Sequence, residues 1–375
     1  MKKLVFVNNI ITPYRTFLFN KLAEKGVDVC VYYQAYTESD RSWKIDLSEL
    51  KHPYWVDERG VDLTIKKQLF HINPRIVWKI IKLNKDYDVQ IPGWGDINTF
   101  VLCVLKKMHI VRCSYSFSCE ANYLGFYGPA PKSKFKNAIK QFEMSCIDGF
   151  AIIPGEMPIR ALKYFGVDIT KIRFAVLPNI IQDDRIYRTY AYSVTHNRPV
   201  FIIPARLIER IKGVLNFLTC IGIENIKKCE FWLVGDGVNE QLYKDFIVNN
   251  KLEDYVKLLG FKNVDELNIL YNEADALLLP SYYDQSPLTL VEATKVGLPI
   301  LASNHCGNHF ECVEPGKNGE VFDPCNPQYV KDSFEKFMNE IDLWPSFSNY
   351  SEEIYKTKFA PDVAIDSFIK QISEE

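Results

Sequence analysis

Short apolar runs alternate with longer segments of helical periodicity along the first half of the chain. The apolar runs predict strands at residues 4–7, 27–33, 88–91, 109–114, 149–153 and 173–177. Between them, the periodicity predicts helices at residues 14–24, 97–106 and 156–165. Thr12 is placed to cap the first helix, because Pro13 suits a first helical position. This alternation favours a parallel sheet covered by helices on both faces.

Residues 180–198 interrupt the pattern with a polar, aperiodic segment that is typical of a linker between domains. Beyond it, strands are predicted at residues 200–203, 231–234, 256–258, 276–279 and 299–302. We therefore predict a first domain at residues 1–185, a linker at 186–198 and a second domain at 199–349. A C-terminal helix at about residues 350–375 is expected to pack back on the first domain.

The predicted fold class is α/β, with two doubly wound, Rossmann-like domains facing each other across a cleft. A length of 375 residues also fits two domains better than one. In open parallel sheets, ligands bind beyond the carboxyl ends of the strands. Candidate functional residues are therefore sought in the loops that directly follow the predicted strands.

Composition is that of an ordinary globular protein, with 47% hydrophobic and 25% charged residues. No segment approaches the ~20 consecutive apolar residues that span a bilayer. The opening MKKLVFVNNI is interpreted as a strand, because its apolar run is too short for a signal peptide. A cytoplasmic protein is expected, with peripheral attachment to the inner face of the membrane as a further hypothesis.

The ten cysteines and six histidines are scattered and form no recognisable metal-binding motif. There is no C-x-x-C pair and no H-E-x-x-H segment. Reduced, buried thiols are the expected state of the cysteines. The sequence therefore predicts neither a metal site nor a cofactor.

The net charge of −2 conceals two halves of opposite sign. Residues 1–185 hold 27 Lys and Arg against 19 Asp and Glu, a net +8, whereas residues 186–375 hold 18 against 28, a net −10. The basic half suits an anionic membrane or a phosphorylated acceptor, unless the offset is simply variation in surface charge. KSKFKNAIKQF, residues 132–142, has the pattern of a basic amphipathic helix that rests on a membrane or faces solvent. Nucleic acid is not expected, because basic and aromatic residues do not interleave as in single-strand binders.

Three stretches after strands of the second half carry candidate binding residues. Arg206 and Lys212 follow the strand at 200–203, where a guanidinium and an ammonium can converge on one phosphate. Gly237 closes a Gly-Asp-Gly turn that allows close backbone approach. Gly260 and Phe261 end another strand, where backbone groups can read a nucleobase edge. Taken singly, each stretch also fits an ordinary solvated loop or turn.

The sharpest stretch is LPSYYDQSPLTLVEATKVGLPILAS, residues 279–303. A helix is expected to begin near Ser286 and Pro287, so its first amides are free to bind a phosphate. Two carboxylates flank this helix start. Glu292 can accept hydrogen bonds from a ribose, and Asp284 lies at the rim where a sugar can sit. The alternative is a loop acid and a paired helix acid.

Together these stretches resemble the retaining, nucleotide-sugar-dependent glycosyltransferases of the GT-B fold. That large group includes sucrose synthases, phosphatidylinositol mannosyltransferases and many bacterial polysaccharide glycosyltransferases. The resemblance runs in order through PAR with Lys212-Gly213, VGDG, LGF, the acid pair, GLP and PGKNGEVF. The first half matches less tightly, although LPNII at residues 177–181 resembles the family's exit from its first domain.

The resemblance implies roles for the matching residues of the second half. Arg206 and Lys212 would hold the donor diphosphate, and Glu292 would bind ribose. Asp284 would lie near the donor sugar, although the family usually has a longer Glu at that position. Further donor contacts are expected from Gly237, Gly260, Phe261, Ser286, Pro287, Leu288 and Thr289. Ser286-Pro287 departs from the Phe-Gly of many relatives, so the phosphate site is expected to be altered.

The first domain is expected to hold the acceptor. Many relatives have a His after the strand that corresponds to residues 109–114, but SYSFSCEANY has none, which leaves Glu120 as the candidate polar group, or as a surface loop acid. Pro13, Tyr14 and Arg15 at the first helix start, and Trp94 in Gly93-Trp94-Gly95, follow strands and are expected to face the cleft. Pro13 is equally explained as a good helix start.

The sequence therefore predicts an enzyme that moves a hexose or N-acetylhexosamine from a nucleoside-diphosphate sugar, with UDP favoured, to a saccharide or lipid-linked saccharide in cell-surface polysaccharide assembly. The cation pair and the helix start would stabilise the departing diphosphate, so no metal is predicted. A nucleotide-sugar epimerase of the same fold and a non-catalytic sugar-nucleotide binder are the alternatives. A dehydrogenase is disfavoured, because neither half opens with G-x-G-x-x-G.

Overall fold

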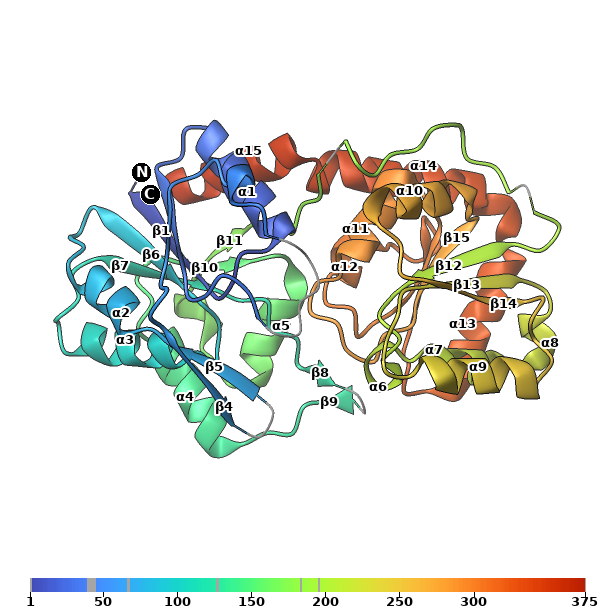
Figure 1. Cartoon of the computed structure of the whole chain (residues 1–375), viewed down its shortest axis with the longest axis horizontal. Coiled ribbons are helices and arrows are strands. Elements are labelled where there is room, and N and C mark those ends of the chain that lie inside the picture. The colour runs from blue at the N-terminus through green and yellow to red at the C-terminus, as the bar shows by residue number, and fades with distance from the viewer. Residues whose placement is uncertain are drawn as a thin grey trace. The chain divides into compact units, whose positions relative to one another are not determined.

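The computed structural model describes residues 2–38, 45–65, 68–125, 128–182, 184–194 and 196–374. The chain divides into two compact units, which are coloured along the sequence in Figure 1. The first unit comprises Met1–Ala121, Pro131–Ile180 and Pro361–Glu375, and the second comprises Asn122–Ala130 and Ile181–Ala360.

The first unit is built on a seven-stranded parallel sheet in the order β11-β10-β7-β6-β1-β2-β3. Its strands are β1 Lys3–Asn8, β2 Val29–Tyr33, β3 Tyr54–Val56, β6 Tyr87–Ile91, β7 Ser114–Ser118, β10 Phe150–Ile153 and β11 Arg173–Val176. A separate antiparallel hairpin pairs β4, Val61–Ile65, with β5, Gln68–Ile72. The helices are α1 Pro13–Glu24, α2 Pro74–Ile81, α3 Ile97–Lys107, α4 Lys134–Met144, α5 Glu156–Tyr164 and α15 Pro361–Ser373, with short 3-10 turns at Leu47–Glu49 and Ile169–Lys171.

Alternate residues of β1 supply the two apolar cores of this unit. Leu4 and Phe6 lie in a buried cluster with residues of α1 and α15. Val5 and Val7 lie in the opposite cluster with residues of α2, α3 and α5. The strand is therefore apolar on both faces, as a central parallel strand must be when helices cover the sheet twice.

The second unit is built on a six-stranded parallel sheet in the order β14-β13-β12-β15-β16-β17. Its strands are β12 Val200–Pro204, β13 Glu230–Val234, β14 Val256–Gly260, β15 Ala276–Leu279, β16 Ile300–Ser303 and β17 Gly319–Phe322, with a small pair β8 Leu124–Gly125 and β9 Gly128–Pro129. The helices are α6 Glu209–Lys212, α7 Val214–Ile221, α8 Ile223–Ile226, α9 Glu240–Asn249, α10 Val264–Glu273, α11 Leu288–Val296, α12 His309–Cys312, α13 Pro327–Asn339 and α14 Trp344–Ile354. A 3-10 turn at Ile341–Leu343 precedes α14, and a π-helical turn at Tyr355–Phe359 follows it.

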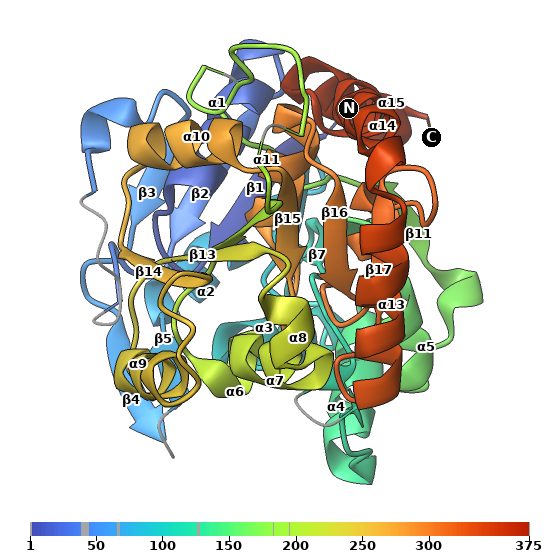
Figure 2. The ribbon, with the colours of Figure 1, turned by 90° about the vertical axis from the view of Figure 1, so that its right-hand side faces the viewer.

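Both faces of this second sheet are also covered. Phe201 and Ile203 of β12 pack with residues of α7, α9 and α13, while Val200 and Ile202 pack with residues of α10 and α11. Figure 2 shows α13 running beside β17, where the two elements are in contact. The predicted α/β class with two doubly wound sheets is confirmed, and the strand at residues 276–279 has the predicted bounds.

One predicted strand was misplaced. Residues 109–114 were expected to be a strand, but β7 begins only at Ser114. His109 has a φ of 58°, and the amide of Ile110 donates to the carbonyl of Leu105, a bond that closes the end of α3. The turn after the helix therefore uses residues that the apolar pattern had assigned to the strand. The strands β3, β4, β5, β8, β9 and β17 were not predicted.

The expected linker packs along the second unit. The amides of Tyr187 and Thr189 donate to the side chains of Asn268 and Asn272. The hydroxyl of Tyr192 donates to the carbonyl of Asp275. The boundary between the units falls between Ile180 and Ile181 rather than at residue 185. At the C-terminus, α14 lies in the second unit and α15 in the first.

Candidate functional site

The loop after β12 is held tightly against the loop after β15. Gly213, at the end of α6, has a φ of 62°, and a Cβ there would lie 2.7 Å from the carbonyl oxygen of Pro280. The amides of Tyr282 and Tyr283 both donate to the carbonyl of Ile211. A glycine is therefore required where the backbone turns, and this close approach fixes the position of the residue before it.

That residue, Lys212, forms an ion pair with Asp284. Its Nζ lies 2.6 Å from Oδ2 of Asp284, and the two side chains are only 17% and 19% exposed. The predicted diphosphate-binding cation and the first predicted acid thus meet at the carboxyl edge of the second sheet. A carboxylate so placed orients the ammonium, and an arriving phosphate would compete for the same charge. Arg206 of the same loop is exposed, and its guanidinium forms no ion pair with a described residue.

The glycines after β13 also allow close packing at this edge. A Cβ on Gly235 would lie 2.2 Å from the carbonyl oxygen of Ala205, and one on Gly237 would lie 2.5 Å from that of Leu207. The amide of Leu207 donates to the carbonyl of Asp236. Gly237 therefore serves at least to bring the loops after β12 and β13 together.

α11 begins at Leu288, with Pro287 as its N-cap and no side-chain cap among the described residues. The helix start predicted near Ser286 and Pro287 is thus correct to within two residues. The side chain of Asn308 donates to the carbonyl of Pro287 and ties the loop after β16 to this helix start. The first-turn amides of Leu288 and Thr289 carry the partial positive charge that attracts a phosphate.

Glu292 is held from the neighbouring helix. The hydroxyl of Tyr271, on α10, donates to its Oε2 at 2.7 Å. Burial raises the pKa of Glu292, an effect that the hydrogen bond from Tyr271 partly offsets. One carboxylate oxygen is oriented by this bond, and the other is available to accept hydrogen bonds from a ligand.

Gly260 and Phe261 end the edge strand β14. Gly260 has a φ of 69°, and Phe261 is 69% exposed. An aromatic ring this exposed contributes little to the core. The exposed ring of Phe261 therefore favours contact with a flat ligand over the alternative, in which Phe261 is packed at a strand end.

A segment from the first half of the sequence contributes to the second unit. The side-chain amide of Asn122 donates to the carbonyls of both Asp284 and His305, at 2.9 and 2.8 Å. The amide of Asp284 in turn donates to the carbonyl of His305. Asn122 therefore braces the loop that carries the predicted acid, although the sequence had marked only its neighbour Glu120.

In the first unit, Glu120 lies two residues after the end of β7 and forms an ion pair with Arg15 of α1. The two side chains are 24% and 13% exposed. The guanidinium also lies over the ring of Tyr14, 5.5 Å from its centroid. Pro13 occupies the first position of α1, but its neighbour Thr12 makes no side-chain capping bond. The fold thus unites Glu120, predicted as a catalytic residue, with Tyr14 and Arg15, predicted as acceptor contacts.

Trp94 lies in an aromatic cluster of the first unit. Its ring centroid is 5.9 Å from that of Phe117 and 5.6 Å from that of Phe165. Nζ of Lys140 lies 4.7 Å above the same indole and 3.1 Å from the centroid of Phe165. Partial burial lowers the pKa of Lys140 to about 8. Lys140 therefore belongs to this cluster and not to the open face of the predicted basic helix.

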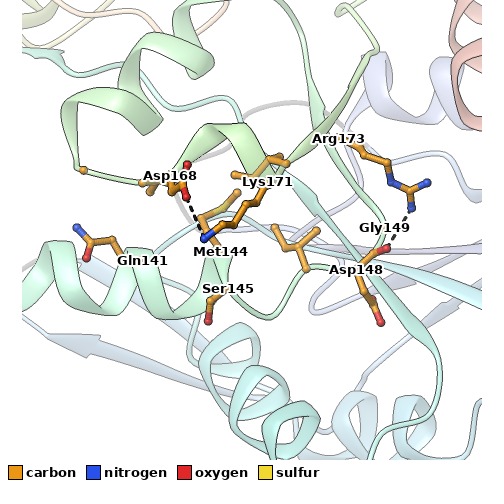
Figure 3. Close-up of a pocket in the computed structure, with 12 residues that line it drawn as sticks. Gln141, Met144, Ser145, Asp148, Gly149, Asp168, Lys171 and Arg173 are labelled. Atoms are coloured by element: carbon orange, nitrogen blue, oxygen red, sulfur yellow. Dashed lines mark hydrogen bonds and ion pairs between the residues drawn. The ribbon is translucent and has the colours of Figure 1, made fainter.

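A cavity of about 420 Å³ opens elsewhere in the first unit (Figure 3). Its lining includes Ser145 and Asp148 after α4, and Asp168, Lys171 and Arg173 before or at the start of β11. Figure 3 shows Lys171 directed toward Asp168, and Arg173 donating to the carbonyl of Asp148. These residues lie at the amino ends of β10 and β11, the edge opposite to the one that binds ligands in such sheets.

Two residues that hold the candidate site, Asn122 and Tyr271, were not predicted from the sequence. Each acts on a partner distant in the sequence, such as Tyr271 on Glu292, so no local spacing marks them. His305 and Asn308, in the loop after β16, hold the site through their bonds to the carbonyls of Tyr282 and Pro287. No helix among the described residues combines the length and apolar character needed to cross a membrane.

The chain is similar in sequence to known glycosyltransferases. The family described as glycosyl transferases group 1 matches residues 191–354. The amylovoran biosynthesis glycosyltransferase AmsK of Erwinia amylovora is 40% identical over 84 residues, which is 21% of each chain. The match thus spans about a fifth of that relative. The alpha-monoglucosyldiacylglycerol synthase of Acholeplasma laidlawii is 34% identical over 325 residues, 80% of this chain and 78% of the relative.

Solved structures extend the comparison to the whole chain. Anabaena Alr3699/HepE, whose crystal structure was determined with UDP, has a TM-score of 0.73 and 15% identity, and the match covers 100% of both chains. A match with 15% sequence identity shows that the two proteins share a fold. The GT-B fold class predicted from the sequence is thereby confirmed.

Proposed function

Because the chain belongs to the glycosyl transferases group 1 family, we propose that it transfers a hexose or N-acetylhexosamine from a nucleoside-diphosphate sugar to a saccharide acceptor with retention of configuration. The observation that carries the proposal is the placement of Lys212, its partner Asp284 and the uncapped start of α11 on adjoining loops. UDP is the favoured nucleotide, since the Anabaena relative was crystallised with it.

The proposed chemistry depends on the negative charge that the departing diphosphate acquires. Arg206, Lys212 and the first amides of α11 stabilise this charge, each donor supplying on the order of 3 kcal/mol in a preorganised site. Asp284 keeps Lys212 in position until the donor arrives. This arrangement needs no metal at the diphosphate.

Donor recognition is divided among the remaining predicted residues. Glu292, oriented by Tyr271, accepts hydrogen bonds from the ribose. Phe261 is exposed after β14 and contacts the nucleobase, while Ser286 and Thr289 flank the phosphates at the start of α11. The departing phosphate helps to deprotonate the acceptor on the same face of the sugar. Two carboxylates about 5 Å apart, the arrangement of retaining glycosidases, are then unnecessary.

The acceptor is proposed to bind the first unit through Pro13, Tyr14, Arg15 and Trp94. Glu120 fixes Arg15 by their ion pair and supplies the polar group that replaces the family histidine. A lipid-linked saccharide is favoured, because one relative is named as an alpha-monoglucosyldiacylglycerol synthase and another as an amylovoran biosynthesis glycosyltransferase. Attachment to an anionic membrane surface is proposed to bring the enzyme to such an acceptor.

The test is donor binding by the purified full-length chain. Arg206→Ala removes one phosphate contact, worth about 1.5–3 kcal/mol, so the dissociation constant for a UDP-sugar should rise by about ten- to a hundredfold. Lys227→Ala is the matched control, because this exposed lysine follows α8 at the amino edge of the sheet. Thermal shift with UDP-, GDP-, ADP- and dTDP-sugars identifies the base through the stabilisation that binding confers.

Turnover separates the proposal from its alternatives. A transferase hydrolyses the donor slowly until an acceptor is added, whereas an epimerase converts the donor alone. Near-normal binding and turnover by Arg206→Ala would contradict the assignment of the diphosphate site. Binding without turnover in the presence of saccharide and lipid-linked acceptors would indicate a non-catalytic binder.

A further inference from the structure

The loops after β16 and β17 bring together three side chains that favour a transition metal. β16 and β17 are paired in parallel, with Ser303 opposite Phe322. His305 follows the first strand and Asp323 follows the second, so both emerge at the same edge of the sheet. Cys325 lies two residues beyond Asp323. One ligand atom from each of the three lies within 4.8 Å of the others.

The imidazole of His305 is oriented as a metal ligand would be. Its Nδ1 lies 2.8 Å from the carbonyl oxygen of Tyr282, to which it donates. Nε2 then carries the lone pair, and it lies 3.9 Å from Oδ1 of Asp323. His305 is 3% exposed, so its ring is held in place. Metal-bound histidines nearly always donate their other ring nitrogen to a carbonyl or carboxylate in this way.

The carboxylate of Asp323 is positioned by its own turn. Its Oδ1 accepts a hydrogen bond from the amide of Cys325 at 2.9 Å. Cys325 is exposed, and the 40% exposure of the Asp323 side chain leaves the same side open. A metal can therefore enter from solvent and reach the buried imidazole.

From these contacts we propose that His305 Nε2, Asp323 and the Cys325 thiolate form a binding site for Zn²⁺ or a similar borderline divalent cation. Zinc–nitrogen and zinc–sulfur bonds of about 2.0–2.3 Å place ligand atoms about 3.3–3.8 Å apart in a tetrahedron. Side-chain shifts of about 1 Å close the site. Binding deprotonates the thiol, releases one proton to solvent, and leaves the fourth position to water.

The metal would brace the loop that holds Asp284. His305 donates to the carbonyl of Tyr282, and the amide of Asp284 donates to the carbonyl of His305. A cation that fixes the imidazole therefore stabilises residues 282–284 without touching the diphosphate. The inference concerns metal binding alone and does not depend on the proposed transferase activity.

The test is titration of the chelator-treated, full-length protein with Zn²⁺ and Co²⁺. We expect one Zn²⁺ per chain by calorimetry, a raised melting temperature, and a thiolate-to-cobalt charge-transfer band with Co²⁺. Cys325→Ser, at an exposed position, should abolish the band and weaken Zn²⁺ binding at least tenfold. Cys220→Ser, at a half-buried position on α7, is the control and should leave both unchanged.

His305→Gln should also weaken Zn²⁺ binding at least tenfold, and its melting temperature without metal shows whether the fold is retained. Failure of the wild-type chain to bind Zn²⁺ would overturn the proposal. So would a cobalt band or a Zn²⁺ affinity that survives in Cys325→Ser. Each outcome is read without a glycosyl donor, so it is independent of the test of the proposed function.

Discussion

Gly213 lets the Lys212 loop lie against the backbone that follows β15. Its left-handed φ of 62° and the 2.7 Å approach of the Pro280 carbonyl are separate constraints, because the first concerns the backbone and the second a collision. Gly316 offers a comparison, since its φ is 76° but no atom lies within 4 Å of its Cβ position. Comparing Gly213 with Gly316 therefore separates the cost of the left-handed backbone from the cost of the collision.

We predict that Gly213→Ala destabilises the protein more than Gly316→Ala. Both substitutions cost about 1–2 kcal/mol for the left-handed backbone, and only the first adds about 1–3 kcal/mol for the collision. Urea denaturation measures the difference. Gly213→Ala should also weaken donor binding, because it displaces Lys212. Equal losses of stability in the two variants would show that the loops can separate without cost.

His52 is a buried histidine, so its protonation in acid places a charge in the protein interior. It is 2% exposed, its Nδ1 lies 2.8 Å from Oδ1 of Asn20, and its Nε2 lies 3.2 Å from the hydroxyl of Tyr33. Burial lowers the pKa of His52 to about 4. Neither Asn20 nor Tyr33 offers a charge that would compensate the imidazolium.

Stability should therefore fall as the pH is lowered from about 6.5, the unfolded pKa, toward 4. The unfolded chain binds the proton first, so protonation favours unfolding, and the cost between pH 7.5 and 5 is about 2 kcal/mol. His52→Gln should lose correspondingly less stability over this range in urea denaturation. Burial raises the pKa of Glu143 to about 7 and acts in the opposite direction, but it affects both proteins equally. Parallel pH profiles would contradict the prediction.

Among single residues, the sequence predicted Arg206, Lys212, Asp284 and Glu292 as candidates, because each lies in a loop after a predicted strand or in the helix that follows such a loop. It did not predict that Lys212 and Asp284 neutralise each other, since 72 positions separate them. Pairing of this kind depends on which loops the sheet order makes neighbours. The roles assigned to these residues in catalysis remain predictions.

Two helices cooperate to present Glu292. α11 carries the carboxylate, and α10 supplies the hydroxyl of Tyr271, which is completely buried. A similar bond joins Tyr243 of α9 to Oε2 of Glu209, but Glu209 is also held by the amides of Leu215 and Asn216. Glu292 has a single such support among the described residues, so its orientation should depend more on the tyrosine hydroxyl.

Tyr271→Phe is therefore predicted to weaken donor binding several-fold, whereas Tyr243→Phe should leave it unchanged. Both variants remove one buried hydrogen bond, and each should lose about 1–2 kcal/mol of stability. Calorimetry with a UDP-sugar measures binding, and urea denaturation measures stability. A UDP-sugar affinity that is equal in the two variants would remove Glu292 from the donor site.

Elements were predictable where an apolar run was unbroken and ended at a polar residue or a proline on each side. β15 is an unbroken apolar run between Asp275 and Pro280, and its bounds were predicted correctly. The start of β7 was predicted too early, because the turn that closes α3 uses the apolar residues around Ile110. β17 contains a glycine and a glutamate among four residues, so its pattern resembles a turn.

At the scale of the whole chain, sequence order and spatial order differ in two places. Residues 122–130 lie in the first half of the sequence but belong to the second unit, and α15 returns to the first unit. A C-terminal helix at about residues 350–375 was expected to pack back on the first domain, whereas the excursion of residues 122–130 has no periodic signal. Hydrophobic pattern assigns faces to elements, but it does not specify which of two similar sheets receives a short segment of glycine and aromatic residues.

The excess of positive charge in residues 1–185 accompanies exposed aromatic side chains on three helices. α2 contacts α3, and α3 contacts α4. Exposed on them are Trp78 at 58%, Phe100 at 42% and Phe135 at 76%. Lys134 and Lys136 flank Phe135 and are also exposed. Aromatic side chains beside lysines are typical of surfaces that rest on anionic lipid headgroups.

We predict that the protein co-sediments with vesicles containing anionic phospholipid and does not co-sediment with neutral ones. Each lysine near the surface contributes about 1 kcal/mol, and this attraction should weaken as salt is raised. Phe135→Ser combined with Trp78→Ser should reduce the bound fraction severalfold by removing the apolar anchors. Tyr329→Ser, at a 48% exposed aromatic on α13 of the second unit, is the control and should bind normally. Equal binding to neutral vesicles, or an unaffected double variant, would show that the basic charge of the first half serves a different partner.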